Sequence, residues 1–282
     1  MLALRNRRGM ALIFVLWMLV LLGLAIGELV ARARAESRTV ETLRARAVAR
    51  YAAESGVLTT TTALQTLLDS ASDPEDFAPH ARHLDTLGRQ PASLAGDNAQ
   101  FAVAVVDLNT RLDLARSDPA ALQLLFAQFV PASRADEITA ALRDDPVTRF
   151  SELARVPGAD DAFALAVAPY VTVSSDGLID VNAAPEAVLA ALPGIGPAKA
   201  RSIIARRDGG EVLASADEFR PPPGAGRAAA DSEGTALTVA PTRIMLVSRG
   251  WQRGTPLTHE IQAVYVVLAG TLTLQSWEER DR

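Results

Sequence analysis

An uncharged run of eighteen residues, MALIFVLWMLVLLGLAIG at positions 10–27, constrains this chain more than any other feature of its sequence. As a helix, the run would measure about 27 Å, close to the thickness of the hydrocarbon core of a bilayer. The two alternatives are a buried helix of a soluble core and a secretory signal peptide. Signal peptides end in small residues at a cleavage site, whereas this run continues into charged sequence at Glu28. The run therefore predicts a transmembrane helix.

The charged sequence that follows continues a helical pattern. No proline occurs before Pro74, and apolar residues recur at the spacing of one helix face. These residues are Leu29, Val30, Ala33, Val40, Leu43, Ala47, Tyr51 and Leu58. We predict one helix over residues 10–69, amphipathic beyond the membrane, with a bend at the four threonines 59–62, which are poor helix formers.

A short basic leader precedes the apolar run. Residues 1–9 contain three arginines and no acid, and they end in Gly9 directly before Met10. This layout resembles the precursors of type IV pilin-like proteins. The resemblance implies that the prepilin peptidase cuts after Gly9 and that Met10 is then N-methylated.

The same resemblance implies a topology. It places a single span in the bacterial inner membrane, with the N-terminus in the cytoplasm and the body of the chain in the periplasm. Arginine counts alone predict the opposite orientation, because three arginines precede the span and six lie within residues 28–50. The predicted topology therefore rests on the resemblance, since the leader must face the cytoplasm to be cut.

Position 14 departs from the ordinary pilin pattern. Pilins carry Glu at the fifth residue of the mature chain, and the resemblance implies that this Glu pairs with the free N-terminus of a neighbouring subunit. A carboxylate in lipid is costly unless it is paired. The present chain has Phe14 there, and a subunit without the Glu needs no neighbour above it, which suits a filament tip. Protein K (GspK) of the type II secretion system is the pseudopilin family with this exception.

Strand-like segments follow the helix and recur at the end of the chain. They are residues 99–114, 243–251 and 261–277. The first lies in a predicted pilin-like part at residues 70–116, and the other two lie in a second such part at residues 235–282. Apolar residues occupy both faces of the first segment, which predicts that both faces are covered. We expect these segments to form an antiparallel sheet that packs on the amphipathic half of the helix, with residues 70–100 forming mainly loops before it.

Residues 117–213 change to helical texture. Two segments, 150–173 and 179–210, share the order helix, Pro-Gly turn, helix, and we interpret them as two helix-hairpin-helix units. Protein K proteins carry stretches similar to Arg111–Leu114 and Asp180–Pro185, the latter in a helical domain inserted into the pilin sheet. The Pro/Gly/Ala-rich residues 214–234 predict a flexible linker.

These features predict an α+β fold. A long N-terminal transmembrane and amphipathic helix packs on a small antiparallel, pilin-like sheet, and a mostly helical domain is inserted between the strands.

The second hairpin is the sharpest short motif of the chain. Gly194 and Gly196 permit positive φ angles and expose backbone N–H groups at the start of the next helix, which carries Lys199 and Arg201. In DNA-binding proteins such a hairpin contacts phosphate; the alternative is a packing unit. Residues 180–210 hold four basic and three acidic residues, a net charge of +1, which favours packing or protein contact over DNA binding.

No catalytic or cofactor-binding constellation is present in the sequence. The chain has no cysteine and only three histidines, and it contains no phosphate-binding loop and no nucleophile motif. Some protein K proteins bind calcium near an acidic stretch, but the corresponding residues here are only Asp144 and Asp145, too few for a calcium loop. We predict no enzyme activity, no cofactor and no metal.

The resemblance predicts a minor pseudopilin at the tip of the type II secretion pseudopilus. It would assist pseudopilus assembly and the export of folded proteins across the outer membrane. Its partners would be the other minor pseudopilins, the major pseudopilin and the prepilin peptidase, with secreted cargo as a further candidate. Two alternatives stay open: a membrane-anchored helix-hairpin-helix protein of DNA uptake, and a minor pilin of a type IV pilus.

Overall fold

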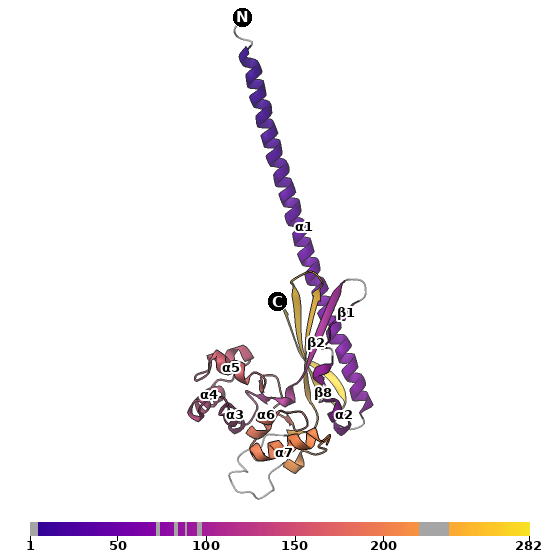
Figure 1. Cartoon of the computed structure of the whole chain (residues 1–282), viewed down its shortest axis with the longest axis vertical. Helices are drawn as coiled ribbons and strands as arrows, with labels where there is room; N and C mark the ends of the chain where they lie inside the picture. The colour runs from indigo at the N-terminus through magenta and orange to yellow at the C-terminus, as the bar shows by residue number, and fades with distance from the viewer. Residues whose placement is uncertain (1–4, 72–73, 82–83, 88, 95–97, 220–236) are drawn as a thin grey trace.

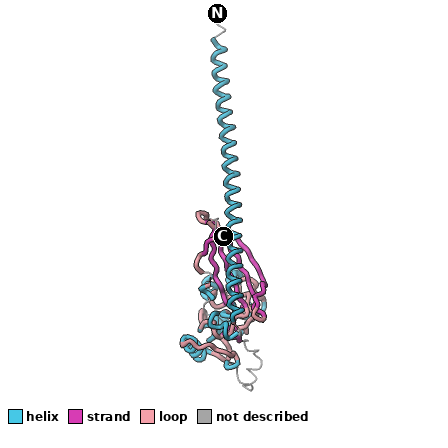
Figure 2. Tube along the Cα trace, turned by 90° about the vertical axis from the view of Figure 1, so that its right-hand side faces the viewer, coloured by secondary structure: helices cyan, strands magenta, loops and turns pink. Residues whose placement is uncertain are grey.

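One long helix dominates the shape of the molecule. The computed structural model describes residues 5–71, 74–81, 84–87, 89–94, 98–219 and 237–282. Helix α1 (Arg5–Ser70) projects alone over its N-terminal part and lies against a sheet over its C-terminal part (Figure 1). A helical insert lies at the end of the molecule opposite the N-terminus, beyond the sheet (Figures 1 and 2).

The remaining elements are short. The other helices are α2 (Pro74–Ala81), α3 (Pro119–Phe126), α4 (Ala132–Asp144), α5 (Asp161–Val167), α6 (Glu186–Ala191) and α7 (Gly196–Asp208). The strands are β1 (Ala92–Ser93), β2 (Ala99–Asp107), β3 (Leu112–Asp113), β4 (Val171–Thr172), β5 (Ile179–Asp180), β6 (Leu237–Thr238), β7 (Arg243–Gln252), β8 (Thr258–Leu268) and β9 (Thr271–Asp281). Single 3₁₀ turns are η1 (Leu84–Thr86), η2 (Leu108–Thr110), η3 (Phe150–Arg155) and η4 (Asp217–Phe219).

Helix α1 continues through the four threonines 59–62, and the bend predicted there stays a prediction. The hydroxyls of Thr61 and Thr62 donate to the carbonyls of Val57 and Leu58, four residues earlier, at 2.8 and 2.9 Å. This back-bonding satisfies each hydroxyl beside the backbone ladder. The helix therefore continues through the run without a break.

Five antiparallel strands form the main sheet in the order β1-β2-β7-β8-β9. The long strands β7, β8 and β9 are consecutive hairpins, joined through Gly254 and through the two-residue turn Ala269-Gly270. Gly254, Ala269 and Gly270 all have positive φ angles, as tight hairpin turns require. Strands β2 and β7 are neighbours although more than 130 residues separate them in the sequence. The helical insert occupies the connection between β2 and β7. This arrangement confirms the predicted α+β fold with a helical domain inserted between the strands of the sheet.

Close contact between α1 and the sheet depends on small residues. Gly250 of β7 lies directly against the helix, where a side chain would overlap the carbonyl oxygen of Ala49 and the amide nitrogen of Ala53. Ser248, two residues along the same strand face, donates its hydroxyl to the carbonyl of Ala53 at 2.7 Å. Opposite them, Gly56 leaves space for Phe101 of β2. Backbones therefore approach closely here without leaving a buried carbonyl unpaired.

Three expectations about β2 and α1 are wrong. Only one face of β2 is fully covered: Phe101, Val103 and Val105 are buried under α1. On the other face, residues 102 and 106 are half-buried and Ala104 is exposed. The strand also ends at Asp107 rather than continuing to residue 114, because η2 interrupts it. Moreover, α1 packs on the sheet through alanines and through Val57, Leu64 and Leu68, and not through the predicted apolar face.

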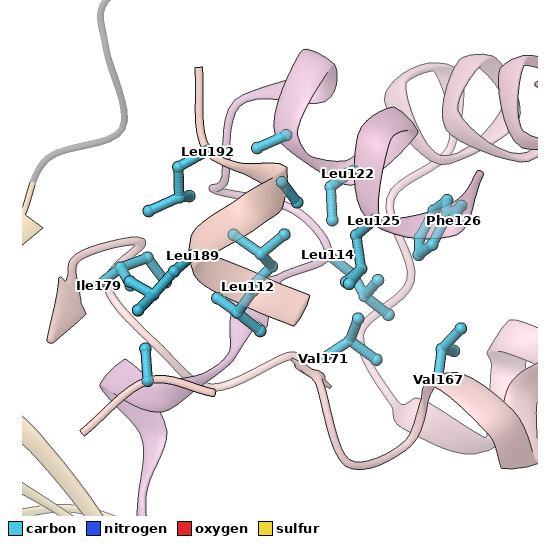
Figure 3. Packing of buried hydrophobic residues seen from close by; sticks show 14 of the residues in the cluster. Leu112, Leu114, Leu122, Leu125, Phe126, Val167, Val171, Ile179, Leu189 and Leu192 are labelled. Carbon is cyan, nitrogen blue, oxygen red and sulfur yellow. The ribbon is translucent and has the colours of Figure 1, made fainter. Parts of the chain in front are cut away.

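The insert has its own hydrophobic core, built from α3 to α7 and the short parallel pairs β3–β4 and β5–β6. Figure 3 shows side chains from these elements converging, among them Leu112 of β3, Leu125 of α3 and Leu189 of α6, all fully buried. Phe126 and Phe163 meet edge to face with ring centroids 5.2 Å apart. The insert thus buries an apolar interior of its own.

The segment between α1 and β2 is more ordered than predicted. Part of residues 70–100 forms α2 and η1, and Phe77 and Leu84 are buried in the core under the sheet. Of the predicted linker 214–234, residues 220–234 lie outside the described residues. Residues 217–219 form η4, and Phe219 is buried in the insert core.

Candidate functional site

The N-terminal part of α1 is an exposed apolar surface of membrane length. Every side chain described between residues 12 and 27 is exposed, and the helix is long and apolar enough to cross a bilayer. Phe14 is 72% exposed, and no carboxylate lies in this stretch. Gly9 and Met10 lie within α1, and only the helical backbone is described at these two positions. Such a surface is stable only in lipid or against other helices.

A second apolar stripe continues along α1 beyond the membrane length. Its members are the exposed residues Leu29, Ala33, Val40, Leu43, Ala47, Tyr51 and Leu58, spaced three, four or seven residues apart. Ala47, Tyr51 and Leu58 each lie two residues beyond a sheet-facing residue, and two residues correspond to about 200° around a helix. The stripe therefore runs along the face of α1 opposite the sheet.

The position of this stripe differs from the position predicted from the sequence. The predicted amphipathic face was expected to pack on the sheet, but Tyr51 and Leu58 are 64% and 70% exposed. The buried side of α1 instead carries Ala45, Ala49 and Ala52, whose small side chains give little hydrophobic signal. Farther along the helix, it carries Val57, Leu64 and Leu68, which are buried in the core under the sheet. Helix α1 is consequently apolar on two opposite faces, and only one of them is covered within the chain.

The second hairpin has the predicted backbone. Helices α6 and α7 pack on each other, and Gly194 and Gly196 between them have φ angles of +86° and +67°. Beside the hairpin, an open groove of about 1000 Å³ is lined by apolar residues of three elements, including Leu124, Tyr170, Pro185, Pro193 and Pro197. The hairpin thus borders an apolar surface.

The basic side chains of α7 are turned toward the chain's own acceptors. Lys199 donates to the carbonyl of Gly194 at 3.1 Å, and Arg201 donates to the carbonyl of Pro197 at 3.2 Å. Arg206 forms ion pairs with Glu211 and Glu218, both at 2.6 Å, and their hydrogen bonds raise its pKa.

Arg207 caps the carbonyl of Ala184 at 2.6 Å. Arg206 and Arg207 are thus held by acceptors of the chain, which leaves only the exposed Lys199 and Arg201 as cationic groups without an ion pair among the described residues of α7. A surface with two such groups suits packing better than phosphate binding.

The chain has two Asp-X-Asn motifs, which the sequence analysis did not single out as a pair, and the first of them joins the insert to the sheet. Asp107 and Asp180 each accept a hydrogen bond from the backbone N–H of the Asn two residues later, at 2.8 Å. Asn109, fully buried, donates to Asp176 and to the carbonyl of Leu178 and accepts from the N–H groups of Thr242 and Arg243. It thereby ties η2 to β7 and to the segment before β5.

Asn182 repeats this role inside the insert. Its side-chain amide donates to the carbonyls of Leu213 and Val239, and its oxygen accepts from the N–H of Leu213. Both asparagines thus hold three chain segments together through a completely bonded amide. The repeated Asp-X-Asn spacing is the sequence signal by which these residues could have been found.

Asp107 is the chemically unusual group of this junction. Burial and the nearby charge of Asp180 raise the pKa of Asp107 well above its ordinary value of 3.8. Its second carboxylate oxygen is buried without a hydrogen-bond partner in the described structure. The junction therefore favours a protonated Asp107.

A second charged cluster joins β9 to the rest of the sheet. Glu260 of β8 is fully buried and contacts Arg249, Arg280 and Arg282. Burial alone would raise its pKa, but hydrogen bonds from Arg249, Arg280 and Gln262 outweigh that effect and lower the pKa of Glu260 to about 2. Glu260 therefore remains ionised and holds the arginines of the two neighbouring strands.

Among the residues that the structure describes, no group of three or more histidine or acidic side chains is arranged to hold a metal ion. The functional features are therefore surfaces and junctions: the apolar faces of α1, the hairpin with its groove, and the Asp-X-Asn junctions.

Comparison with known proteins gives a match to a family model and a match to a solved structure. Residues 179–240, which include the second hairpin unit, match the family model of the type II secretion system (T2SS), protein K. A chain of the crystal structure of the GspK–GspI–GspJ complex from the type 2 secretion system of enterotoxigenic Escherichia coli matches the fold with a TM-score of 0.60 and 16% identity. The match covers 86% of the present chain and 99% of that chain. No curated protein matches the sequence.

Proposed function

We propose, from the match of residues 179–240 to the protein K family model and from the fold shared with a chain of the GspK–GspI–GspJ complex, that the chain belongs to the protein K family of the type II secretion system and is a minor pseudopilin at the tip of a pseudopilus. It is a structural subunit and not an enzyme. The observation that carries the proposal is the combination of a membrane-length helix, a pilin-like sheet and a helical insert between β2 and β7. Its function is to assemble with other pseudopilins and so to assist the export of folded proteins.

The exposed stripe of α1 is the surface we assign to this assembly. Its members Val40, Leu43, Tyr51 and Leu58 are 58–70% exposed. An apolar helix stripe with this spacing suits packing against another helix. Minor pseudopilins of the GspI and GspJ type, which accompany GspK in the solved complex, are the partners we assign to it.

The insert and Phe14 support the position at the tip. The insert lies at the end of the molecule opposite the membrane helix (Figure 1), where it would limit the addition of a further subunit. Phe14 lacks the carboxylate that would pair with the N-terminus of a subunit above. We place the leader on the cytoplasmic side, with the prepilin peptidase cutting after Gly9 and Met10 becoming N-methylated.

The hairpin of α6 and α7 then serves packing or protein contact. Lys199 and Arg201 bond to backbone carbonyls, and Arg206 is paired with two carboxylates. A role in DNA uptake would require these groups to turn outward toward phosphates, so we do not propose it.

The assembly role is tested by charging the stripe. In Tyr51→Glu/Leu58→Glu, two carboxylates replace exposed apolar groups, so the fold of the single chain should persist while helix packing in the assembly is lost. We expect co-purification with the other minor pseudopilins from detergent-solubilised membranes to fall at least ten-fold, and secretion of the exported proteins to fall with it.

Thr66→Glu provides the matched control. Thr66 is exposed on α1 but lies off the stripe, and it should retain both co-purification and secretion. Normal assembly and secretion in the stripe variant, at equal protein level, would contradict the proposed role of this face.

A further inference from the structure

The segment of α1 that follows the membrane span carries an excess of positive charge. Residues 28–50 contain six arginines and three glutamates, a net charge of +3. Some of these arginines have partners: Arg32 pairs with Glu28 at 2.5 Å, and Arg50 pairs with Glu54 and Glu279. In the described part of the chain, Arg34 and Arg38 form no ion pair.

Arg34 and Arg38 lie four residues apart and are both exposed. Like charges at this spacing lie side by side on a helix and destabilise it unless an anion lies close to them. The neighbouring acids on α1 are Glu36 and Glu41, and neither is paired with these arginines in the structure. The pair therefore presents an unneutralised cationic site.

The position of the pair along α1 determines what it meets. Arg34 lies seven residues beyond Gly27, or about 10 Å at 1.5 Å per residue, and the headgroup layer is about 5–7 Å thick on each side of the hydrocarbon core. Helical side chains lean toward the N-terminus, here toward the membrane. The guanidinium of Arg34 thus reaches the headgroups. Arg38 lies one turn farther from the membrane and still attracts the charged headgroups, because it is within the Debye length of about 8 Å from them.

The position around the helix leaves the pair free during assembly. Ala45 and Ala49, which face the sheet, lie eleven residues beyond Arg34 and Arg38, close to three full helical turns. The arginines thus lie on the sheet side of α1, below the sheet, and opposite the apolar stripe. Packing of the stripe against other helices therefore leaves the arginines directed outward, toward surrounding lipid.

We propose that Arg34 and Arg38 form a binding site for the phosphate of anionic phospholipid headgroups in the leaflet at the C-terminal end of the span. The inference rests on the proposed insertion of residues 10–27 in a bilayer and not on the tip position. Basic residues this close to an anionic surface each contribute enough attraction to change binding about five-fold. The site would hold α1 at a defined depth and would explain an arginine excess that the topology rule does not predict on this side.

The experiment uses the full chain reconstituted in phosphatidylcholine bilayers with a trace of spin-labelled lipid. Electron spin resonance measures how strongly the protein prefers labelled phosphatidylglycerol to labelled phosphatidylcholine. Arg34→Gln/Arg38→Gln should lower this preference several-fold, and 0.5 M NaCl should lower the wild-type preference likewise. The leader arginines act on the other leaflet and are unchanged in every variant.

The control is Arg143→Gln/Arg155→Gln, which removes the same charge from exposed positions of the insert; it should keep the wild-type preference. Equal preference in the wild type and the Arg34/Arg38 variant, or a preference that salt does not change, would overturn the proposal. Absence of any motionally restricted lipid would instead contradict bilayer insertion, on which the proposed function depends.

Discussion

Asp107 shows how the junction between sheet and insert changes the chemistry of a single residue. It ends β2 and begins η2, where its carboxylate accepts the N–H of Asn109. The same position buries it beside the charge of Asp180, and its pKa is raised. The fold therefore binds a proton at Asp107 more tightly than the unfolded chain does.

This proton gives the stability a defined pH dependence. Because the pKa of Asp107 is higher in the folded state, its contribution is fully present below 3.8 and is lost as the pH rises through the raised pKa. Asp107→Asn mimics the neutral form and should flatten this fall in the free energy of unfolding. Chemical denaturation of the full chain in detergent, followed by tryptophan fluorescence at several pH values, measures the free energy of unfolding as a function of pH.

Asp144→Asn is the matched control for this prediction. Asp144 is exposed at the end of α4, and its removal should leave the wild-type pH profile. If the free energy of unfolding of Asp107→Asn still fell with pH as in the wild type, between the unfolded-state and folded-state pKa values of Asp107, then Asp107 would be ionised in the folded protein.

At the level of elements, the backbones of α1 and β7 are in direct contact at Gly250. Gly250→Ala would place a methyl group against the carbonyl of Ala49 and the amide of Ala53. Since these are backbone atoms of a helix, relief requires the helix to move off the sheet. We expect the free energy of unfolding to fall by about 3 kcal/mol, measured by the same denaturation.

Gly209→Ala serves as the comparison. Gly209 follows α7 with a negative φ angle, and its nearest neighbours for an added methyl are at 3.3 Å or more, so the change should stay within about 1 kcal/mol. Equal stability of Gly250→Ala and the wild type would mean that α1 and β7 are not in this close contact.

The sequence predicted elements well where one pattern dominated. The absence of proline and the long apolar run indicated α1, and the strand-like residues 243–251 and 261–277 indicated the C-terminal strands of the sheet. The side of α1 that packs on the sheet was predicted wrongly, because alanines at positions 45, 49 and 52 give no hydrophobic signal while the apolar stripe faces outward. Packing in this region depends on the absence of side chains, which periodicity does not detect.

The candidate site was predicted unevenly for a similar reason. Gly194 and Gly196 were found because a Pro-Gly turn between helices is a local pattern, and their positive φ angles agree with it. The bonds of Asn109 to residues near positions 178 and 242 could not be predicted, since they depend on segments that only the fold brings together. Likewise, the pairing of Arg206 with Glu218 required the path of the chain after α7.

In the whole molecule, we assign different functions to the N-terminal part of α1 and to the helical insert. The N-terminal part of α1 inserts and assembles, while the insert lies at the opposite end (Figure 1). In this account Phe14 fits a subunit with nothing above it. Phe14→Glu should therefore restore the pairing group of a subunit within the filament and reduce both tip placement and secretion, measured by labelling of pseudopilus ends and by exoprotein export.

Phe14→Leu is the control, since it keeps the position apolar and should behave as wild type. Unchanged tip placement and secretion in Phe14→Glu would show that the missing carboxylate does not determine the position of the subunit.

The mass of the N-terminus distinguishes a pseudopilin from any other membrane-anchored chain. The protein is isolated from membranes with and without a co-expressed prepilin peptidase, and its N-terminal peptide is measured by mass spectrometry. The account predicts loss of residues 1–9 and one added methyl group on Met10 only when the peptidase is present. An intact N-terminus in the presence of active peptidase would contradict it.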